Sequence, residues 1–183
     1  MQNLIIDIGN TAVKAAWAEG TTIGKTFRYQ GERVRNFILS LTEKEKPSVM
    51  IISSVNEISA HDEAAYSNEC ERLIIMDSAH TQVLIDNGVP EWVSCDRAAS
   101  VIAVRHLFRG NGCTVMDFGT TFSIDFIDKD GGYAGGNISL GCRTRFKALN
   151  RYSRALPLVD TPSEIEFPGN SFLSSVTSGI ISG

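Results

Sequence analysis

The sequence predicts an α/β protein of two lobes built on one plan, of which the second is incomplete. Short apolar runs alternate with segments whose apolar residues have helical spacing, an order typical of α/β folds. Three strands, then helix, strand, helix and strand, precede a second three-strand start, and a short motif recurs in both starts. We therefore expect an N-terminal lobe over residues 1–111 and a partial C-terminal lobe over residues 112–183.

The first lobe is predicted to open on a buried strand and a tight turn. The apolar residues 4–6 end at Asp7, and Gly9-Asn10 follows as a turn signal. A helix is predicted where apolar residues recur at helical spacing and stop before Pro47. The other expected elements are strands at 13–18, 21–29, 49–52 and 72–76, and helices at 34–41, 59–68 and 96–108.

The second lobe is predicted to start in the same way. A buried strand at 113–116 ends at Asp117, and Asp130-Gly131-Gly132 is typical of a hairpin turn. The last residues resemble the middle of a helix, so we expect further elements or a partner to cover the apolar surface of this lobe. The other expected elements are strands at 122–128 and 133–138, helices at 143–149 and from 172 onward, and a loop at 157–168.

Composition excludes several classes of function. The 183 residues are 43% hydrophobic and 21% charged, with a formal net charge of -4 and no basic cluster, which argues against a nucleic-acid surface. No apolar run approaches the ~18 residues of a membrane span, and no secretory signal precedes the first strand. The four cysteines form no C-x-x-C, and the three histidines are scattered, so we expect reduced thiols and a cytoplasmic protein.

A weak internal duplication carries the chemical prediction. Ile6-Asp7-Ile8-Gly9-Asn10-Thr11 aligns without a gap with Met116-Asp117-Phe118-Gly119-Thr120-Thr121. Glycine allows a close backbone approach to a ligand, and consecutive N–H groups in such a turn form a concave anion site. A carboxylate beside a polyphosphate also needs a cation between them. Either copy alone fits an ordinary strand and turn, whereas two copies, each opening a lobe, favour a phosphoryl-transfer site.

The paired turns resemble the two phosphate motifs of the actin, hexokinase and Hsp70 superfamily, and the variant Gly9-Asn10-Thr11 resembles type III pantothenate kinases in particular. Other matches follow in the same order along the whole chain. They are Ser94-Cys95-Asp96-Arg97, Gly135-Gly136-Asn137-Ile138-Ser139-Leu140-Gly141, Ala148-Leu149, Ala155-Leu156-Pro157, Gly169-Asn170-Ser171 and Ser178-Gly179-Ile180. The resemblance implies an actin-like (ribonuclease H-like) duplicated fold, ATP-dependent phosphorylation of pantothenate in coenzyme A synthesis, and a homodimer.

The resemblance also implies roles for individual residues. Asp117 would hold a monovalent cation, K⁺ or NH₄⁺, and Asp7 would hold Mg²⁺ through phosphates or water. Asp96 would accept the proton of the pantothenate hydroxyl. The ATP-contacting residues would be Asp7, Ile8, Gly9, Asn10, Thr11, Lys14 and Thr120. The substrate-contacting residues would be Asn87, Ser94, Cys95, Asp96, Arg97 and Ser171.

The pair Asp96-Arg97 also makes chemical sense without the resemblance. A primary alcohol that attacks a phosphoryl group loses a proton, which a positioned carboxylate can accept, and arginine offers a fork of donors to a substrate carboxylate. The other interpretation is that Asp96 caps the helix predicted to follow it. The two roles are compatible, because a helix N-terminus also favours a nearby anion.

Three positions depart from the family pattern. Asn87 replaces a tyrosine, Ser94 a glycine and Leu140 a proline, and these changes fall in the expected pantothenate pocket more than in the phosphate turns. They leave two alternatives open. One is a catalytically degenerate family member that acts as a binding or transcription-accessory protein, and the other is a related kinase for a sugar or another hydroxy acid.

Overall fold

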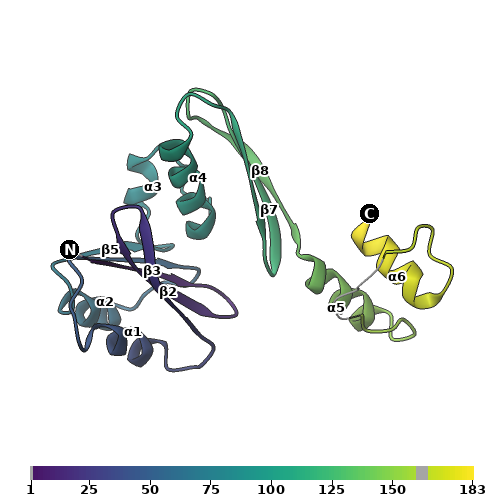
Figure 1. Cartoon of the computed structure of the whole chain (residues 1–183), viewed down its shortest axis with the longest axis horizontal. Helices are drawn as coiled ribbons and strands as arrows, with labels where there is room; N and C mark the ends of the chain where they lie inside the picture. The colour runs from purple at the N-terminus through teal and green to yellow at the C-terminus, as the bar shows by residue number, and fades with distance from the viewer. Residues whose placement is uncertain (1, 160–164) are drawn as a thin grey trace. The chain divides into compact units, whose positions relative to one another are not determined.

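The computed structural model describes residues 2–159 and 165–183, and these form two compact units, one ending at Leu107 and the other beginning at Phe108 (Figure 1). The predicted order of strands and helices is confirmed, with one short helix added. The elements are β1 (Asn3–Ile8), β2 (Val13–Glu19), β3 (Thr22–Tyr29), α1 (Val34–Thr42), β4 (Val49–Ser54), α2 (Ala60–Ser67), β5 (Arg72–Met76), α3 (Gln82–Asp86), α4 (Cys95–Leu107), β6 (Cys113–Phe118), β7 (Thr121–Ile127), β8 (Tyr133–Leu140), α5 (Cys142–Tyr152) and α6 (Phe172–Ile181).

The N-terminal unit is built on a five-stranded sheet in the order β3-β2-β1-β4-β5. β1 pairs antiparallel with β2 and parallel with β4, and β4 pairs parallel with β5. The carboxyl ends of β1, β4 and β5 therefore lie along one edge of the sheet. Ligands of α/β proteins bind outside this edge, and the turn after β1 lies there.

Helices cover the sheet of the N-terminal unit on both sides. Leu4 and Ile6 alternate toward one face, where they join Ile38 of α1 and Tyr66 of α2 in a buried core. In Figure 1, α3 and α4 lie on the other side of the sheet from α1 and α2, and α4 contacts β4. Burial on both faces explains why β4 reads as a continuous apolar run rather than an alternating one.

The helix predicted over 59–68 begins as expected, because the Ser59 hydroxyl accepts a hydrogen bond from the Asp62 amide at 3.1 Å. The short helix α3 was not predicted. It spans five residues and buries one side chain, Leu84. A single buried residue leaves no helical period to detect in the sequence.

The C-terminal unit opens on an antiparallel meander in the order β6-β7-β8. The predicted hairpin turn is confirmed: Asp128 Oδ1 accepts hydrogen bonds from the amides of Asp130 and Gly132 at 2.9 and 2.7 Å. Gly131 has a φ of 85°, a conformation that glycine adopts without a steric penalty. The turn fixes the register of β7 and β8.

The prediction that residues 113–116 form a buried strand is wrong about burial. Met116 of β6 is 55% exposed, and Phe118 is 77% exposed. Helix α5 packs mainly against α6 and touches the sheet at β7. An apolar run predicts a strand, but which faces become covered depends on where the helices pack.

The two helices of the C-terminal unit enclose a small core of their own. Phe146 of α5 is buried against Val176 and Ile180 of α6. The Arg145 guanidinium donates a hydrogen bond to the Ile180 carbonyl at 2.6 Å, near the end of α6. In the part of the chain that the structure describes, no helix has the length and hydropathy that crossing a bilayer requires.

Candidate active site

The first predicted phosphate turn connects β1 to β2. The Gly9 amide donates to the Ala12 carbonyl at 3.1 Å, and the Val55 amide donates to the Ile8 carbonyl at 3.1 Å, which fastens the turn to the end of β4. A Cβ at Gly9 would lie 3.4 Å from the Ala12 carbonyl oxygen, in van der Waals contact with the other end of the turn. The turn is therefore tight and exposes a backbone that a ligand can approach closely.

Asp7 and Lys14 lie side by side next to this turn. They are cross-strand partners in the β1–β2 ladder, and Lys14 Nζ is 3.5 Å from Asp7 Oδ2. Both side chains are well exposed, at 39% for Asp7 and 66% for Lys14. An exposed ion pair contributes little to stability, so both groups can turn to a charged ligand at small cost.

The second predicted phosphate turn connects β6 to β7 and is supported by α5. The Gly119 amide donates to the Thr121 carbonyl at 2.9 Å. The Thr120 carbonyl accepts from the Gly141 amide at 3.0 Å and from the Thr144 hydroxyl at 2.7 Å. These two bonds tie the turn to the first residues of α5.

The two turns differ in the partner of their carboxylate. Asp7 pairs across the ladder with Lys14, whereas Asp117 pairs with the buried Ser123. Asp117 therefore has no basic residue opposite it in its ladder. Oxygen ligands suit hard cations, and the solvent-accessible carboxylates of Asp7 and Asp117 fit that chemistry. Within residues 2–159 and 165–183, no three His, Cys, Asp or Glu side chains gather in one cluster.

The predicted acid–base pair lies at the start of α4. Asp96 is in the first turn, and its Oδ1 accepts from the Arg97 amide at 2.9 Å. Because α4 begins at Cys95, Asp96 lies inside the first turn rather than at the N-cap position predicted for it, where the helix dipole favours its charge. The Arg97 side chain is buried, at 6% exposed. Burial also raises the pKa of the neighbouring Cys95 thiol, and the negative charges of Asp77 and Asp96 raise it further.

Two further predicted substrate residues have structural roles. The Asn87 side chain donates to the Val83 carbonyl at 2.7 Å, at the end of α3, and the Asn87 carbonyl accepts from Arg105. The Ser171 hydroxyl accepts from the Ser174 amide at 3.1 Å and caps α6. Both side chains therefore stabilise a helix end, Asn87 that of α3 and Ser171 that of α6.

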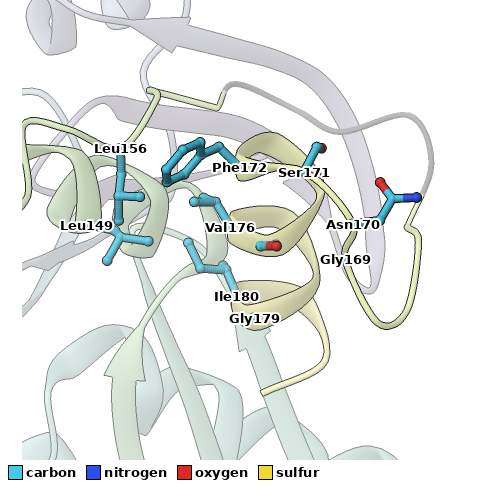
Figure 2. A pocket seen from close by; sticks show the side chains of 10 residues that line it. Leu149, Leu156, Gly169, Asn170, Ser171, Phe172, Val176, Gly179 and Ile180 are labelled. Carbon is cyan, nitrogen blue, oxygen red and sulfur yellow. The ribbon is translucent and has the colours of Figure 1, made fainter.

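Ser171 also borders a cavity of about 870 Å³ between α5 and α6 (Figure 2). Leu149 and Leu156 face Val176 and Ile180 across it. Ser171 lies at the N-terminal end of α6, apart from these leucines (Figure 2). The cavity is mostly apolar.

The family model for type III pantothenate kinase matches residues 3–183. The chain belongs to this family. A type III pantothenate kinase of Phocaeicola vulgatus is 37% identical over 99% of this chain and 75% of its own length. One of Cytophaga hutchinsonii is 30% identical over 99% of this chain and 75% of its own length. The chain thus spans about three quarters of these relatives.

Solved structures place this family member in the expected fold class, the actin-like α/β fold. A candidate Baf family transcriptional activator from Campylobacter jejuni superposes with a TM-score of 0.59 at 19% identity, covering 98% of this chain and 74% of the other. A candidate N-acetylmannosamine kinase from Listeria monocytogenes superposes with a TM-score of 0.50 at 12% identity, covering 88% and 67%. At these identities the likeness concerns the fold.

The fold brings together some of the residues predicted for this kinase. Asp7 and Lys14 line one cavity of about 490 Å³ on the N-terminal unit, and Ser94, Cys95, Asp96 and Arg97 surround the first turn of α4. Asp117 and Thr120 flank the second turn, which belongs to the C-terminal unit. Each unit of the kinase therefore carries one glycine turn with an aspartate beside it.

Asp77 was not among the predicted site residues, although it follows β5 at the same edge of the sheet as Asp7. Asp77 is fully buried. Its Oδ2 accepts from the Ile58 amide at 2.8 Å, and its Oδ1 accepts from the Ala79 and His80 amides, both at 2.9 Å. A sequence signal was present, since Asp77, like Asp7 and Asp117, comes directly after a run of apolar residues.

The His80 ring completes this network. Its Nδ1 lies 2.8 Å from Asp77 Oδ1, and its Nε2 lies 3.8 Å from Glu63 of α2. Burial alone would raise the pKa of Asp77, but hydrogen bonds from the Ile58 amide, the His80 ring and the Ala79 amide together hold that pKa below its ordinary value. The carboxylate thus joins the loop before α2 to the loop that leads to α3 and α4.

Asp77→Asn is expected to lower the free energy of unfolding by about 1–3 kcal/mol at pH 7, because it replaces a charged acceptor by a neutral one. The folded-state pKa is depressed, so this contribution is present above the unfolded pKa of about 3.9 and is lost as pH falls through the folded pKa. Urea unfolding between pH 7 and acid pH measures the stability that the Asp77 carboxylate contributes.

The Asp77→Asn variant should lose less stability on acidification than the unsubstituted chain. Equal acid sensitivity of the two, or an equal effect from Asp86→Asn on exposed α3, would contradict the assignment.

Proposed function

We propose that this chain transfers the γ-phosphoryl group of ATP to the primary hydroxyl of pantothenate, giving 4'-phosphopantothenate, the first step of coenzyme A biosynthesis. Membership of the type III pantothenate kinase family carries the proposal. The paired glycine turns support it chemically, because phosphoryl transfer depends mainly on positioning and on neutralising charge.

In this proposal the first turn holds the phosphates of ATP. Asp7, Ile8, Gly9, Asn10 and Thr11 of this turn are proposed to contact the phosphates, and Lys14 adds a positive charge. The Gly9 N–H is donated to the Ala12 carbonyl, so Gly9 serves by its lack of a side chain. Thr120 of the second turn is proposed as a further ATP-contacting residue. Mg²⁺, held by Asp7 through phosphates or water, would supply further neutralisation of charge.

The start of α4 serves the acceptor. Asp96 takes the proton of the attacking hydroxyl, a role that a carboxylate within hydrogen-bond reach can fill. Arg97 holds the pantothenate carboxylate, since its guanidinium matches that group with two parallel hydrogen bonds. Ser94 and Cys95 beside them, together with Asn87 and Ser171, are proposed to contact the substrate.

We further propose a monovalent cation, K⁺ or NH₄⁺, on Asp117, which has no basic cross-strand partner. Asp117→Asn is then expected to weaken activation by K⁺, so that the concentration for half-maximal rate rises roughly tenfold. A K⁺ titration of the kinase rate measures this, and Asp130→Asn in the β7–β8 turn is the control. An unchanged K⁺ response in Asp117→Asn would refute the site.

The proposal extends to the setting of the enzyme. A homodimer and a cytoplasmic location are what the resemblance to the family implies. Sedimentation of the purified chain over a range of concentrations tests the first, because a dimer dissociates on dilution.

The activity itself is tested with the purified chain, ATP, Mg²⁺, K⁺ and pantothenate. Mass spectrometry should find a product heavier than pantothenate by one phosphoryl group, formed in step with ADP. A reaction without pantothenate gives the background hydrolysis of ATP. Binding of ATP by calorimetry, without any such product, would refute the kinase activity and favour a binding protein.

A further inference from the structure

The register of the N-terminal sheet puts a third charged residue in line with Asp7 and Lys14. Lys14 is the cross-strand partner of Asp7 on one side and of Arg28 on the other. Partners directly opposite in a ladder point to the same face of the sheet. Asp7, Lys14 and Arg28 therefore form one row across β1, β2 and β3.

This row lies beside the first glycine turn. The next pairs along the ladders are Ile8 with Val13 and Val13 with Tyr29, and the turn begins at Gly9. The three charged residues also line the cavity of about 490 Å³ on this face. The other lining residues are Ile5, Ala15, Ala16, Thr26 and Phe27.

The charges of the row do not balance. Lys14 is 3.5 Å from Asp7, but Arg28 makes no hydrogen bond or ion pair within the residues that the structure describes. Two cations directly opposite one another in a ladder repel, which destabilises the pair. One carboxylate cannot compensate for both, so the row carries a net positive charge that an anion would neutralise.

We propose that Arg28 is a further phosphate-binding residue of the nucleotide site, on the strand next to Lys14. The assignment rests on the proposed function, which places the phosphates of ATP at the adjacent turn. Arginine suits this position because its planar fork can bind two phosphate oxygens at once, whereas Lys14 acts as a point charge. Arg28 would thereby distinguish a polyphosphate from a ligand with a single charge.

Arg28→Gln tests the proposal through the affinity for ATP, measured by calorimetry on the purified chain. The Kd is expected to rise roughly tenfold, the usual loss for a hydrogen bond to a charged group. Arg28→Lys should recover part of the loss, because the charge returns without the fork. Inorganic triphosphate should lose affinity by a similar factor, while the KM for pantothenate at saturating ATP stays unchanged.

Lys25→Gln is the matched control, because it removes one positive charge from the same strand. Lys25 lies over the Phe27 ring at 4.9 Å and borders a different cavity, beside Trp17 and Gln2. The ATP affinity of the Lys25→Gln variant should equal that of the unsubstituted chain. Equal ATP affinities for Arg28→Gln and Lys25→Gln would overturn the role of Arg28 and leave the kinase proposal standing. Failure of the unsubstituted chain to bind ATP would overturn both.

Discussion

Asp96→Asn is expected to lower the kcat of pantothenate phosphorylation by about 10²–10⁴, the usual contribution of a positioned general base. The amide keeps an oxygen that can accept from the Arg97 amide, so the start of α4 should stay folded. It cannot accept the proton of the attacking hydroxyl. Steady-state kinetics should therefore show a loss in kcat with little change in the Kd for ATP.

Asp62→Asn provides the control for this experiment. Asp62 also lies in the first turn of a helix of the same unit, α2, where the helix dipole stabilises a carboxylate. Both variants should lose a similar, small amount of stability in urea unfolding, but only Asp96→Asn should lose turnover. A kcat for Asp96→Asn equal to that of Asp62→Asn would show that Asp96 only stabilises the first turn of α4.

Gly141→Ala is expected to disrupt the second phosphate turn. A Cβ at Gly141 would lie 2.0 Å from the Gly119 carbonyl oxygen and 2.9 Å from that of Thr120. Both are backbone atoms, so the turn or the start of α5 must move. The Gly141 φ of -63° is ordinary, so the effect comes from this contact alone.

The overlap should cost about 1–3 kcal/mol of unfolding free energy, as overpacking of a rigid site does. The kcat/KM for ATP should fall with it, because the displaced turn no longer presents Thr120 in place. Urea unfolding and steady-state kinetics measure the two effects. Unchanged stability and kinetics would show that the turn yields easily and does not depend on Gly141.

Gly179→Ala makes the same substitution where there is room. Apart from the neighbouring backbone of α6 itself, no atom lies within 4 Å of a Cβ built at Gly179, in the interior of that helix. It should raise stability by about 0.5–1 kcal/mol, because alanine favours the helix. A loss of stability equal to that of Gly141→Ala would attribute both effects to the added methyl group rather than to the second turn.

Much of the candidate site could be predicted because its signals are local. The motif around Asp7 and its copy around Asp117 both follow an apolar run and precede a glycine turn, and both turns formed as expected. Asp96 likewise lies in the first turn of the helix predicted after it. Asp77 shows the limit, since its donors Ile58 and His80 come from two different loops.

By itself, the sequence determined the order of strands and helices, the two glycine turns and the family, because periodicity, turn residues and motifs act over short stretches of chain. Only the tertiary structure decided which partner lies opposite each carboxylate. Lys14 lies opposite Asp7, with Arg28 on the far side of Lys14, whereas Ser123 lies opposite Asp117. The tertiary structure also decided that Met116 is exposed and that Gly141 presses on the second turn. These facts depend on ladder register and helix packing, which leave no periodic signal in the sequence.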